Sequence, residues 1–330
     1  MSTGSPRLSV AAPVYNEVEI LPELIRRLDA VLDELPGGPH EIVIVDDGST
    51  DGTRELLLTE IQSRHRLVAV ALSRNFGHQA ALSAALDHAG GDAVVLMDGD
   101  LQDAPEEIPE FVARYREGYD VVYAQRSSRK EGLLHRLAYA AAYRIIAGLS
   151  SVALPLDAGD FGLMSRRVVD QLRDAPERQR YLRGLRAWVG FRQIGVPVHR
   201  AERAAGRSKY SWSRLFGLAF DGLFSFSVAP LRAAALLGFL AIALSSAFAV
   251  YSIVARLLFD RVPQGFTALI VVMTFLSGMN LLFLGLLGEY LGRVYEEVKR
   301  RPLYVAERVL RRSPDASVAR SESLRVERAG

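Results

Sequence analysis

The sequence predicts a soluble α/β domain with a doubly wound, mostly parallel sheet, followed by two membrane-spanning helices. Two observations support this fold class. Over residues 7–126, short runs rich in β-branched residues alternate with amphipathic segments, as they do when crossover helices join parallel strands. Near the C-terminus, Ala233–Ala255 and Gly265–Gly288 contain no charged residue. As a helix, each of these runs is long enough to cross a hydrocarbon core of about 30 Å.

The individual elements follow from local patterns along the chain. Strands are predicted where apolar runs are bounded by polar residues, and helices where apolar positions recur at helical spacing. The predicted strands are Leu8–Ala12, Glu41–Val45, Leu67–Leu72, Ala93–Met97, Asp120–Tyr123 and 191–199. The predicted helices are Glu17–Leu35, Thr50–Ser63, Gln79–Ala89, Pro105–Glu117, Leu133–Leu149, 165–173 and 179–189. A loop is predicted to end in Asp157-Ala158-Gly159-Asp160.

The two apolar runs predict a helical hairpin in a membrane. Arg256, Asp260 and Arg261 place the short turn between them in water. Basic residues concentrate before the first run and after the second, so the positive-inside rule predicts cytoplasmic termini. These residues are Arg203, Arg207, Lys209, Arg214 and Arg232, then Arg293, Lys299, Arg300, Arg301, Arg308, Arg311 and Arg312. The alternative is that both runs are buried core helices of a soluble protein.

The predicted domain organisation has four parts. Residues 1–205 form the soluble domain, 206–232 amphipathic juxtamembrane helices, 233–291 the two spans (233–255 and 265–288), and 292–330 a cytoplasmic tail. Within these parts, 211–228 interleaves aromatic residues with few charges and predicts a helix at the membrane interface, the alternative being an ordinary docking helix. The polar residues 313–330 are expected to be disordered.

Composition narrows the chemistry. The chain has no cysteine, which excludes disulfides, thiolate metal sites and a cysteine nucleophile. Its net charge is +2, so we expect no nucleic-acid partner. The N-terminus lacks the charged and apolar pattern of a cleaved signal peptide. Neither a G-x-G-x-x-G nor a G-x-x-x-x-G-K-[ST] motif occurs where a dinucleotide or P-loop site would need it.

Polar clusters terminate four of the predicted strands. They are Pro13–Glu17, Asp46–Ser49, Ser73–Gln79 and Asp98–Gln102. Ligands of doubly wound sheets bind beyond the carboxyl ends of the strands, so we expect these clusters to meet at one edge. Asp98, Asp100 and Gln102 offer the oxygen ligands that Mg²⁺ and Mn²⁺ prefer, although acidic residues also start turns. Asp46–Ser49 suits sugar hydroxyls or base N–H groups, or forms an Asx turn.

Together these motifs resemble family 2 glycosyltransferases of the GT-A fold. The resemblance rests on Pro13-Val14-Tyr15-Asn16-Glu17, Asp46-Asp47-Gly48-Ser49, Arg74-Asn75-Phe76-Gly77 and Asp98-Gly99-Asp100-Leu101-Gln102. Asp157-Ala158-Gly159-Asp160-Phe161, Arg183-Gly184-Leu185, Gly206-Arg207-Ser208-Lys209-Tyr210 and the two apolar runs are similar to the polyprenyl-phosphate glycosyltransferases in particular. These include dolichol-phosphate mannose synthases and bacterial undecaprenyl-phosphate glucosyl and aminoarabinosyl transferases.

The resemblance implies roles for matching positions. The nucleotide-sugar would be bound by Pro13, Tyr15, Glu17, Asp47 and Asp98, and Mg²⁺ or Mn²⁺ would be held by Asp98, Asp100 and Gln102. Asp160 would lie beside the reacting sugar as an orienting group or auxiliary base. Arg126, ending the strand over 119–126, would bind the acceptor phosphate, with Arg136, Arg207 and Lys209 as further candidates. The alternative is a helix cap or structural turn for Asp160, a plain surface position for Arg126, and membrane-surface charge for Arg207 and Lys209. His78-Gln79 stands where many relatives carry Lys-Glu, and Gly99 replaces the commoner Ala, which we expect only to loosen the backbone.

The function implied is inverting transfer of a hexose from a nucleotide-sugar to polyprenyl phosphate at the cytoplasmic face of the inner membrane. UDP-glucose and undecaprenyl phosphate are the first choice, and GDP-mannose is the alternative donor. A membrane-anchored nucleotide-sugar binder that serves a flippase is the alternative of another class. A processive synthase is disfavoured, because Gln179–Trp188 does not provide a Q-x-x-R-W motif. The implied partners are membrane lipid, further copies of the chain and a separate flippase.

Overall fold

The computed structural model describes residues 7–126, 158–178, 180–198, 229–259 and 265–311. The described chain divides into two compact units. One contains the sheet and its covering helices, and the other contains two long apolar helices.

The first unit is built on an eight-stranded sheet in the order β7-β5-β6-β4-β1-β2-β3-β8. The strands are β1 (Leu8–Val14), β2 (Glu41–Asp46), β3 (Leu67–Leu72), β4 (Ala93–Leu96), β5 (Val121–Arg126), β6 (Ala158–Ser165), β7 (Gln193–Val198) and β8 (Ala306–Arg311). β4, β1, β2 and β3 are mutually parallel, as are β5 and β7. β6 and β8 run antiparallel to their neighbours. The structure therefore confirms the predicted doubly wound, mostly parallel sheet, and it adds two antiparallel strands.

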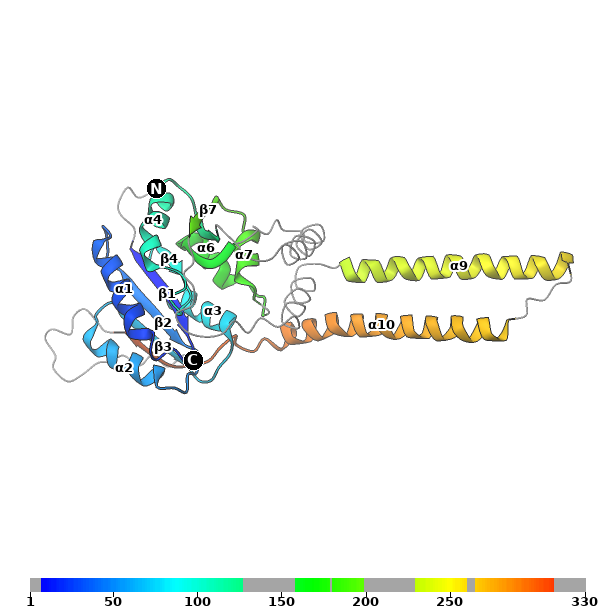
Figure 1. Ribbon diagram of the computed structural model, residues 1–330, viewed down its shortest axis with the longest axis horizontal. Helices are drawn as coiled ribbons and strands as arrows, with labels where there is room; N and C mark the ends of the chain where they lie inside the picture. Colours follow the sequence, from blue (N-terminus) through cyan, green and yellow to red (C-terminus); the bar gives the residue numbers. More distant parts are fainter. Residues whose placement is uncertain (1–6, 127–157, 179, 199–228, 260–264, 312–330) are drawn as a thin grey trace. The chain divides into compact units, whose positions relative to one another are not determined.

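Helices cover both faces of the sheet, and each face has its own core (Figure 1). One face is covered by α1 (Leu21–Glu34), α2 (Thr53–Ser63), the short 3-10 helix η1 (Pro105–Glu107) and α4 (Ile108–Arg116). α3 (His78–His88), α6 (Arg166–Asp174) and α7 (Leu182–Trp188) cover the other. Both faces are buried, which is why β1 to β4 are almost continuously apolar rather than alternating.

Two strands lie where the sequence predicts none. Residues Ala158–Gly159–Asp160, predicted as the end of a loop, begin β6, which pairs with β4 and β5. The predicted tail 292–330 contains β8, which pairs with β3 at the edge of the sheet. In β8, Val309 packs into the core of one face and Leu310 into the core of the other.

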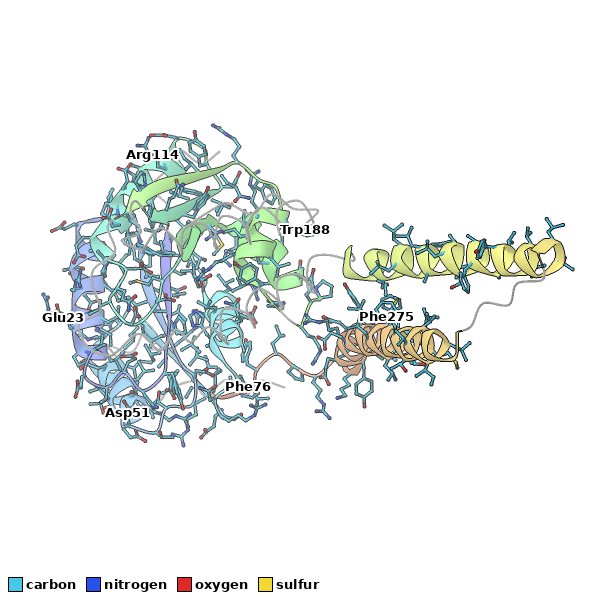
Figure 2. The ribbon with its side chains drawn as sticks, turned by 45° about the vertical axis from the view of Figure 1, so that its right-hand side comes forward. Glu23, Asp51, Phe76, Arg114, Trp188 and Phe275 are labelled. Atoms are coloured by element: carbon cyan, nitrogen blue, oxygen red, sulfur yellow. The ribbon has the colours of Figure 1, made fainter. Side chains whose placement is uncertain are left out.

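The second unit consists mainly of α9 (Ala229–Phe259) and α10 (Phe266–Lys299). Both are long and apolar enough to cross a membrane, and their apolar stretches are not buried within the structure. Apolar side chains such as Phe275 project outward from α10 (Figure 2). The predicted helix 233–255 falls inside α9, and 265–288 falls inside α10 except for Gly265, which caps it. The predicted helix Leu133–Leu149, residues 206–228 and the predicted disordered segment 313–330 lie outside the described residues.

Candidate active site

The polar clusters meet at the carboxyl edge of the parallel strands. The four segments begin at or just after the ends of β1, β2, β3 and β4, and they span residues 13–17, 46–53, 73–77 and 98–103. β6 adds Asp160 to the same edge, because its antiparallel register pairs Gly162 with Leu96 near the end of β4. The sheet topology thus brings together residues from five strand ends.

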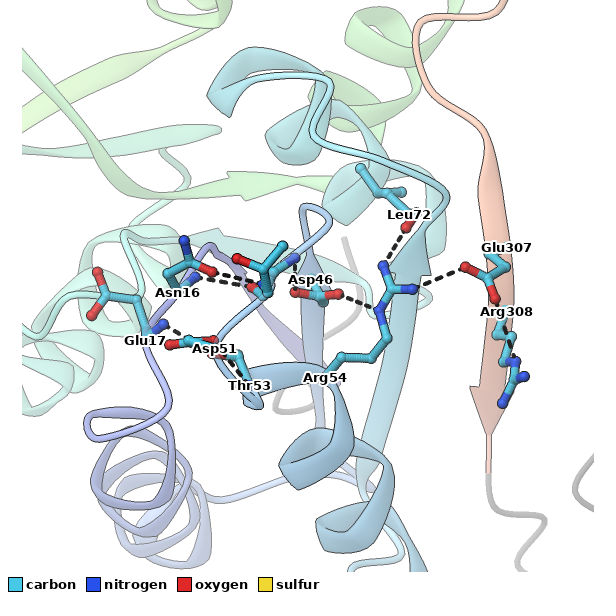
Figure 3. Close-up of polar contacts among 11 residues, drawn as sticks. Asn16, Glu17, Asp46, Asp51, Thr53, Arg54, Leu72, Glu307 and Arg308 are labelled. Atoms are coloured by element: carbon cyan, nitrogen blue, oxygen red, sulfur yellow. Dashed lines mark hydrogen bonds and ion pairs between the residues drawn. The ribbon is translucent and has the colours of Figure 1, made fainter.

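The first two loops are joined by reciprocal hydrogen bonds (Figure 3). Asn16 adopts a positive φ of 56°, its backbone N–H donates to Ser49 Oγ at 2.9 Å, and its side-chain oxygen accepts from Thr50 N at 2.9 Å. Glu17 N donates to Thr53 Oγ1 at 3.0 Å. The exposed Tyr15 side chain and half-buried Glu17 are therefore carried on a loop whose backbone is fixed by its neighbour.

Asp47 and Gly48 fix the third loop against the second. Asp47 is 4% exposed, and its two carboxylate oxygens accept from Phe76 N at 2.8 Å and Gly77 N at 3.0 Å. Burial raises the pKa of Asp47, while these two hydrogen bonds act in the opposite direction. At Gly48, whose φ is +73°, a Cβ would lie 2.4 Å from the backbone carbonyl carbon of Arg74, so the two loops touch backbone to backbone.

Asp98 and Asp100 flank a second close approach. A Cβ at Gly99 would lie 2.6 Å from Pro13 O, so Gly99 lets the 98–102 loop contact the first loop. The expectation that Gly99 only loosens the backbone is therefore wrong. Asp100 Oδ1 accepts from Gln102 N at 3.1 Å, which forms a local turn. Asp98, Asp100 and Gln102 are each half-buried, and their oxygen atoms are chemically suited to a hard cation.

A charged cluster surrounds Asp160. Arg183 of α7 donates from Nε to Asp160 Oδ1 at 2.7 Å and from Nη2 to Oδ2 at 2.5 Å, a bidentate pair. His78, the first residue of α3, places Nε2 at 3.5 Å from Asp98 Oδ1 and 3.7 Å from Asp160 Oδ2. The ligand atoms of His78, Asp98 and Asp160 all lie within 4.8 Å of one another, a spacing that could hold a metal ion.

The cluster keeps Asp160 ionised. Burial alone would raise the pKa of Asp160, but the hydrogen bonds from Arg183 and the nearby His78 hold it well below its ordinary range. Conversely, interaction with the Asp160 carboxylate raises the pKa of His78 against the opposing effect of burial. A carboxylate with a strongly depressed pKa is a weak base, which counts against the auxiliary-base role of Asp160 and leaves the orienting role.

Arg186 of α7 contacts β6, the strand that carries Asp160. It is 3% exposed, donates from Nη2 to Gly159 O at 3.0 Å, and its guanidinium lies 5.2 Å from the centre of the Tyr123 ring. Burial lowers the pKa of Arg186 to about 10. Leu182 N, at the start of the same helix, donates to Gln79 Oε1 at 3.0 Å and joins α7 to α3.

The structure therefore brings some predicted residues together and leaves others apart. Asp98 and Asp160 share one cluster, while Asp47 contacts the third loop and Pro13 is buried beneath Gly99. Arg126 ends β5 with its backbone opposite Val198, and nothing is described of its side chain. Arg136, Arg207 and Lys209 lie outside the described residues.

Three contributors were not singled out from the sequence. His78 entered only as a departure from the family pattern, and Arg183 only as part of the Arg183-Gly184-Leu185 run. Arg186 has no motif of its own. The signal available for the two arginines was their spacing, because residues three apart on a helix share a face.

Comparisons with known proteins agree with this geometry. The model of the family described as "Glycosyl transferase family 2" matches residues 9–173. An uncharacterized glycosyltransferase of Synechocystis is 44% identical over 299 residues, which cover 90% of this chain and 94% of the relative.

Two further relatives carry more specific names. A bactoprenol glucosyl transferase of Shigella phage SfII is 38% identical over 309 residues, covering 93% of this chain and 100% of that protein. An undecaprenyl-phosphate 4-deoxy-4-formamido-L-arabinose transferase of Klebsiella pneumoniae is 37% identical over 319 residues, covering 94% of this chain and 96% of that protein.

Proposed function

The chain belongs to glycosyl transferase family 2, and on that premise we propose that it transfers a hexose from a nucleotide-sugar to the phosphate of a polyprenyl lipid. UDP-glucose is the first choice of donor and undecaprenyl phosphate the first choice of acceptor. One observation carries the proposal. Relatives named for bactoprenol and undecaprenyl phosphate match 93% and 94% of this chain, so the likeness spans the sheet and both apolar helices.

The joined loops at the carboxyl edge would bind the donor. Pro13, Tyr15, Glu17 and Asp47 would surround the base and ribose, and Asp98 would contact the nucleotide-sugar beside them. The mutual hydrogen bonds of these loops support this assignment, because a rigid site loses less conformational entropy when its ligand binds.

Asp98, Asp100 and Gln102 would hold Mg²⁺ or Mn²⁺ against the donor diphosphate. When bound, the ion supplies positive charge that stabilises the departing nucleoside diphosphate. His78, Asp98 and Asp160 form a second candidate ligand set that shares Asp98 with the first. Substitution of the unshared members distinguishes the two sets.

Asp160 would orient the reacting groups rather than accept a proton. Its two oxygens already accept hydrogen bonds from Arg183, and its pKa is depressed. A phosphate monoester has a second pKa near 6 and is mostly dianionic at neutral pH, so its attack needs no strong base. A phosphate oxygen would bond to the anomeric carbon as the bond to the diphosphate breaks. The electron pair would leave with the nucleoside diphosphate, and the centre would invert.

The acceptor phosphate would be bound by basic residues that end β5 or follow it in the chain before α9. Arg126 is the first candidate, because a planar guanidinium matches phosphate oxygens. Arg136, Arg207 and Lys209 are the further candidates. Their charge would also favour an anionic membrane surface.

The sheet supports a two-crossing topology for α9 and α10. β1 to β7 precede these helices in the chain and β8 follows them, yet all belong to one sheet. Both flanks of the helix pair must then lie on one side of a membrane, so the helices cross together or not at all. The basic flanks favour the cytoplasmic side of the inner membrane. We further propose the division of the chain into four parts at 205, 232 and 291, in which β8 of the last part completes the sheet of the first. A homo-oligomer and a separate flippase complete the proposal.

A transfer assay tests the function. The full chain in detergent is incubated with undecaprenyl phosphate, Mn²⁺ and labelled UDP-glucose, GDP-mannose or another nucleotide-sugar, and the lipid extract is counted. We expect label in lipid from UDP-glucose. Label from GDP-mannose alone would replace the donor assignment, and nucleotide binding without transfer from any donor would favour the anchored binder.

A pair of substitutions tests the metal assignment. We expect Asp100→Ala to abolish metal-dependent turnover, whereas His78→Gln should leave the Mn²⁺ concentration for half-maximal activity unchanged. Expression and detergent extraction of both variants serve as controls for insertion. The opposite pattern would move the ion to the His78, Asp98 and Asp160 set.

A further inference from the structure

Arg54, near the start of α2, joins three parts of the sheet through one side chain (Figure 3). Its Nε donates to Asp46 Oδ2 at 2.9 Å, and its Nη2 donates to Leu72 O at 2.6 Å. Its Nη1 donates to Glu307 Oε2 at 2.9 Å. A planar guanidinium with fixed donors thereby connects the ends of β2 and β3 with β8.

Asp46 passes this connection to the donor loops. Its other oxygen, Oδ1, accepts from Ser49 N at 3.0 Å, and Ser49 Oγ accepts from Asn16 N at 2.9 Å. Asp46 is also the residue directly before Asp47, which fixes the 74–77 loop. A continuous series of contacts therefore runs from Glu307 through Arg54 and Asp46 to the first loop.

Because Asp46 is buried, its position depends on the positive charge of Arg54. The Asp46 side chain is 0% exposed, Arg54 is 22% exposed and Glu307 is 43% exposed. A buried carboxylate is costly unless a cation and hydrogen bonds compensate its charge. Arg54 is the cation that pairs with Asp46, and a shift of Arg54 would change the position of the carboxylate that holds Ser49.

We propose that Arg54 is a positioning residue for the nucleotide-sugar site, and that Glu307 acts on that site by orienting Arg54. The inference rests on the proposed function, because it takes loops 13–17 and 46–49 as the donor site. It extends that function by making donor affinity depend on a strand that follows the second apolar helix in the chain.

Steady-state kinetics of the full chain in detergent test the proposal. Donor KM and acceptor KM are measured for Arg54→Lys and Glu307→Gln. Arg54→Lys keeps the charge but loses the planar set of donors, and we expect donor KM to rise about tenfold with acceptor KM unchanged. Glu307→Gln is expected to raise donor KM about threefold, because the remaining two contacts of Arg54 are kept.

A double variant tests whether Glu307 acts through Arg54. Arg54→Lys combined with Glu307→Gln should give the donor KM of Arg54→Lys alone, because the planar guanidinium that Glu307 is proposed to orient is already absent. The matched control is Arg64→Gln. Arg64 follows the last turn of the same helix and pairs with Glu60 and Asp29, so its loss would weaken packing without reaching the donor loops.

The outcomes separate this proposal from the function on which it rests. If the unaltered chain transfers sugar but both variants retain the normal donor KM, the positioning role is wrong. A fall in kcat alone, matched by Arg64→Gln, would also overturn it, because a merely structural role lowers the active fraction and leaves KM unchanged. Should Arg54→Lys not fold, Glu307→Gln decides by itself, since its side chain is nearly half exposed. Absence of transfer by the unaltered chain would instead contradict the proposed function.

Discussion

Asp160 lies between two basic side chains, and this setting decides how it can act. Arg183 occupies both of its oxygens from one side, and His78 approaches Oδ2 from another. Of the two roles open from the sequence we propose orientation, because Arg183 already donates to both oxygens and holds the pKa of Asp160 below its ordinary range, whereas a general base needs a pKa near the working pH. The same pairing makes Asp160 a contributor to stability whose pH dependence can be measured.

Replacement of Asp160 by Asn should lower stability by an amount that does not shrink between pH 7 and about pH 5, and that grows there as His78, whose pKa Asp160 raises, becomes protonated. The folded pKa of Asp160 is depressed, so the stability it contributes is fully present above the unfolded pKa of about 3.9. That contribution is lost as the pH falls below this value toward the lower folded pKa, by at most about 1.4 kcal/mol per pH unit. Denaturant unfolding of both proteins in EDTA measures the difference.

Asp33→Asn is the matched control, because Asp33 pairs with Arg66 at the surface and is 64% exposed. We expect it to have little effect on stability at any pH. A difference for Asp160→Asn that shrinks between pH 7 and pH 5 would mean that the pKa of Asp160 is not depressed.

Single residues show where sequence reasoning succeeds and where it stops. Asp98 follows an apolar strand directly, so its place at the edge of the sheet was predictable. The partnership of Asp160 with Arg183 was not, because it depends on how α7 packs beside β6. Arg54 and Glu307 are far apart in the chain and belong to no motif, so only the folded structure reveals their contact.

At the scale of elements, β1 to β4 were predictable because burial on both faces requires continuous apolar runs. β6 was missed because Gly159, Asp160 and Gly162 interrupt its apolar pattern. Gly162 has a packing reason, since a Cβ there would lie 2.5 Å from Val122 O. β8 was missed because four of its six residues are charged or small, and its two core residues are adjacent. A strand at the sheet edge buries fewer side chains, so its hydrophobic sequence pattern is weak.

The contact between the second and third loops predicts that Gly48→Ala lowers transfer at least about tenfold. The new Cβ would lie 2.4 Å and 2.5 Å from backbone atoms of Arg74 and Asn75, and φ is +73°. The loops must separate, which would disturb the hydrogen bonds that Asp47 accepts. Donor KM and transfer rate measure the effect.

Gly77→Ala is the control for backbone strain alone. Gly77 also has a positive φ, 97°, but a Cβ there meets no atom within 4 Å. We expect Gly77→Ala to cost less activity than Gly48→Ala. Equal losses would show that conformational strain, rather than contact between the loops, limits both variants.

At the scale of the whole molecule, the two apolar helices are inserted in the chain between β7 and β8, two strands of the same sheet. β8 covers the edge of β3, and Tyr304 just before it donates its hydroxyl hydrogen to Asp87 Oδ2 of α3 at 2.9 Å. The family model ends at residue 173, so β8 and Tyr304, which make these contacts, lie well beyond the matched region. A chain could therefore contain every predicted donor residue and still lack part of its sheet.

Truncation after Arg301 should abolish donor binding, whereas truncation after Arg312 should preserve it. The first removes β8, and with it two buried side chains, each worth about 1.5–3 kcal/mol, and Glu307, one of the three partners of Arg54. It also exposes the unpaired backbone of β3, an edge that favours aggregation. The second removes only residues after β8. Size-exclusion profiles, nucleotide affinity and lipid labelling of the two proteins in detergent distinguish them. Full donor affinity in the shorter protein would show that the sheet up to β3 holds the donor loops by itself, and that β8 is dispensable for the site.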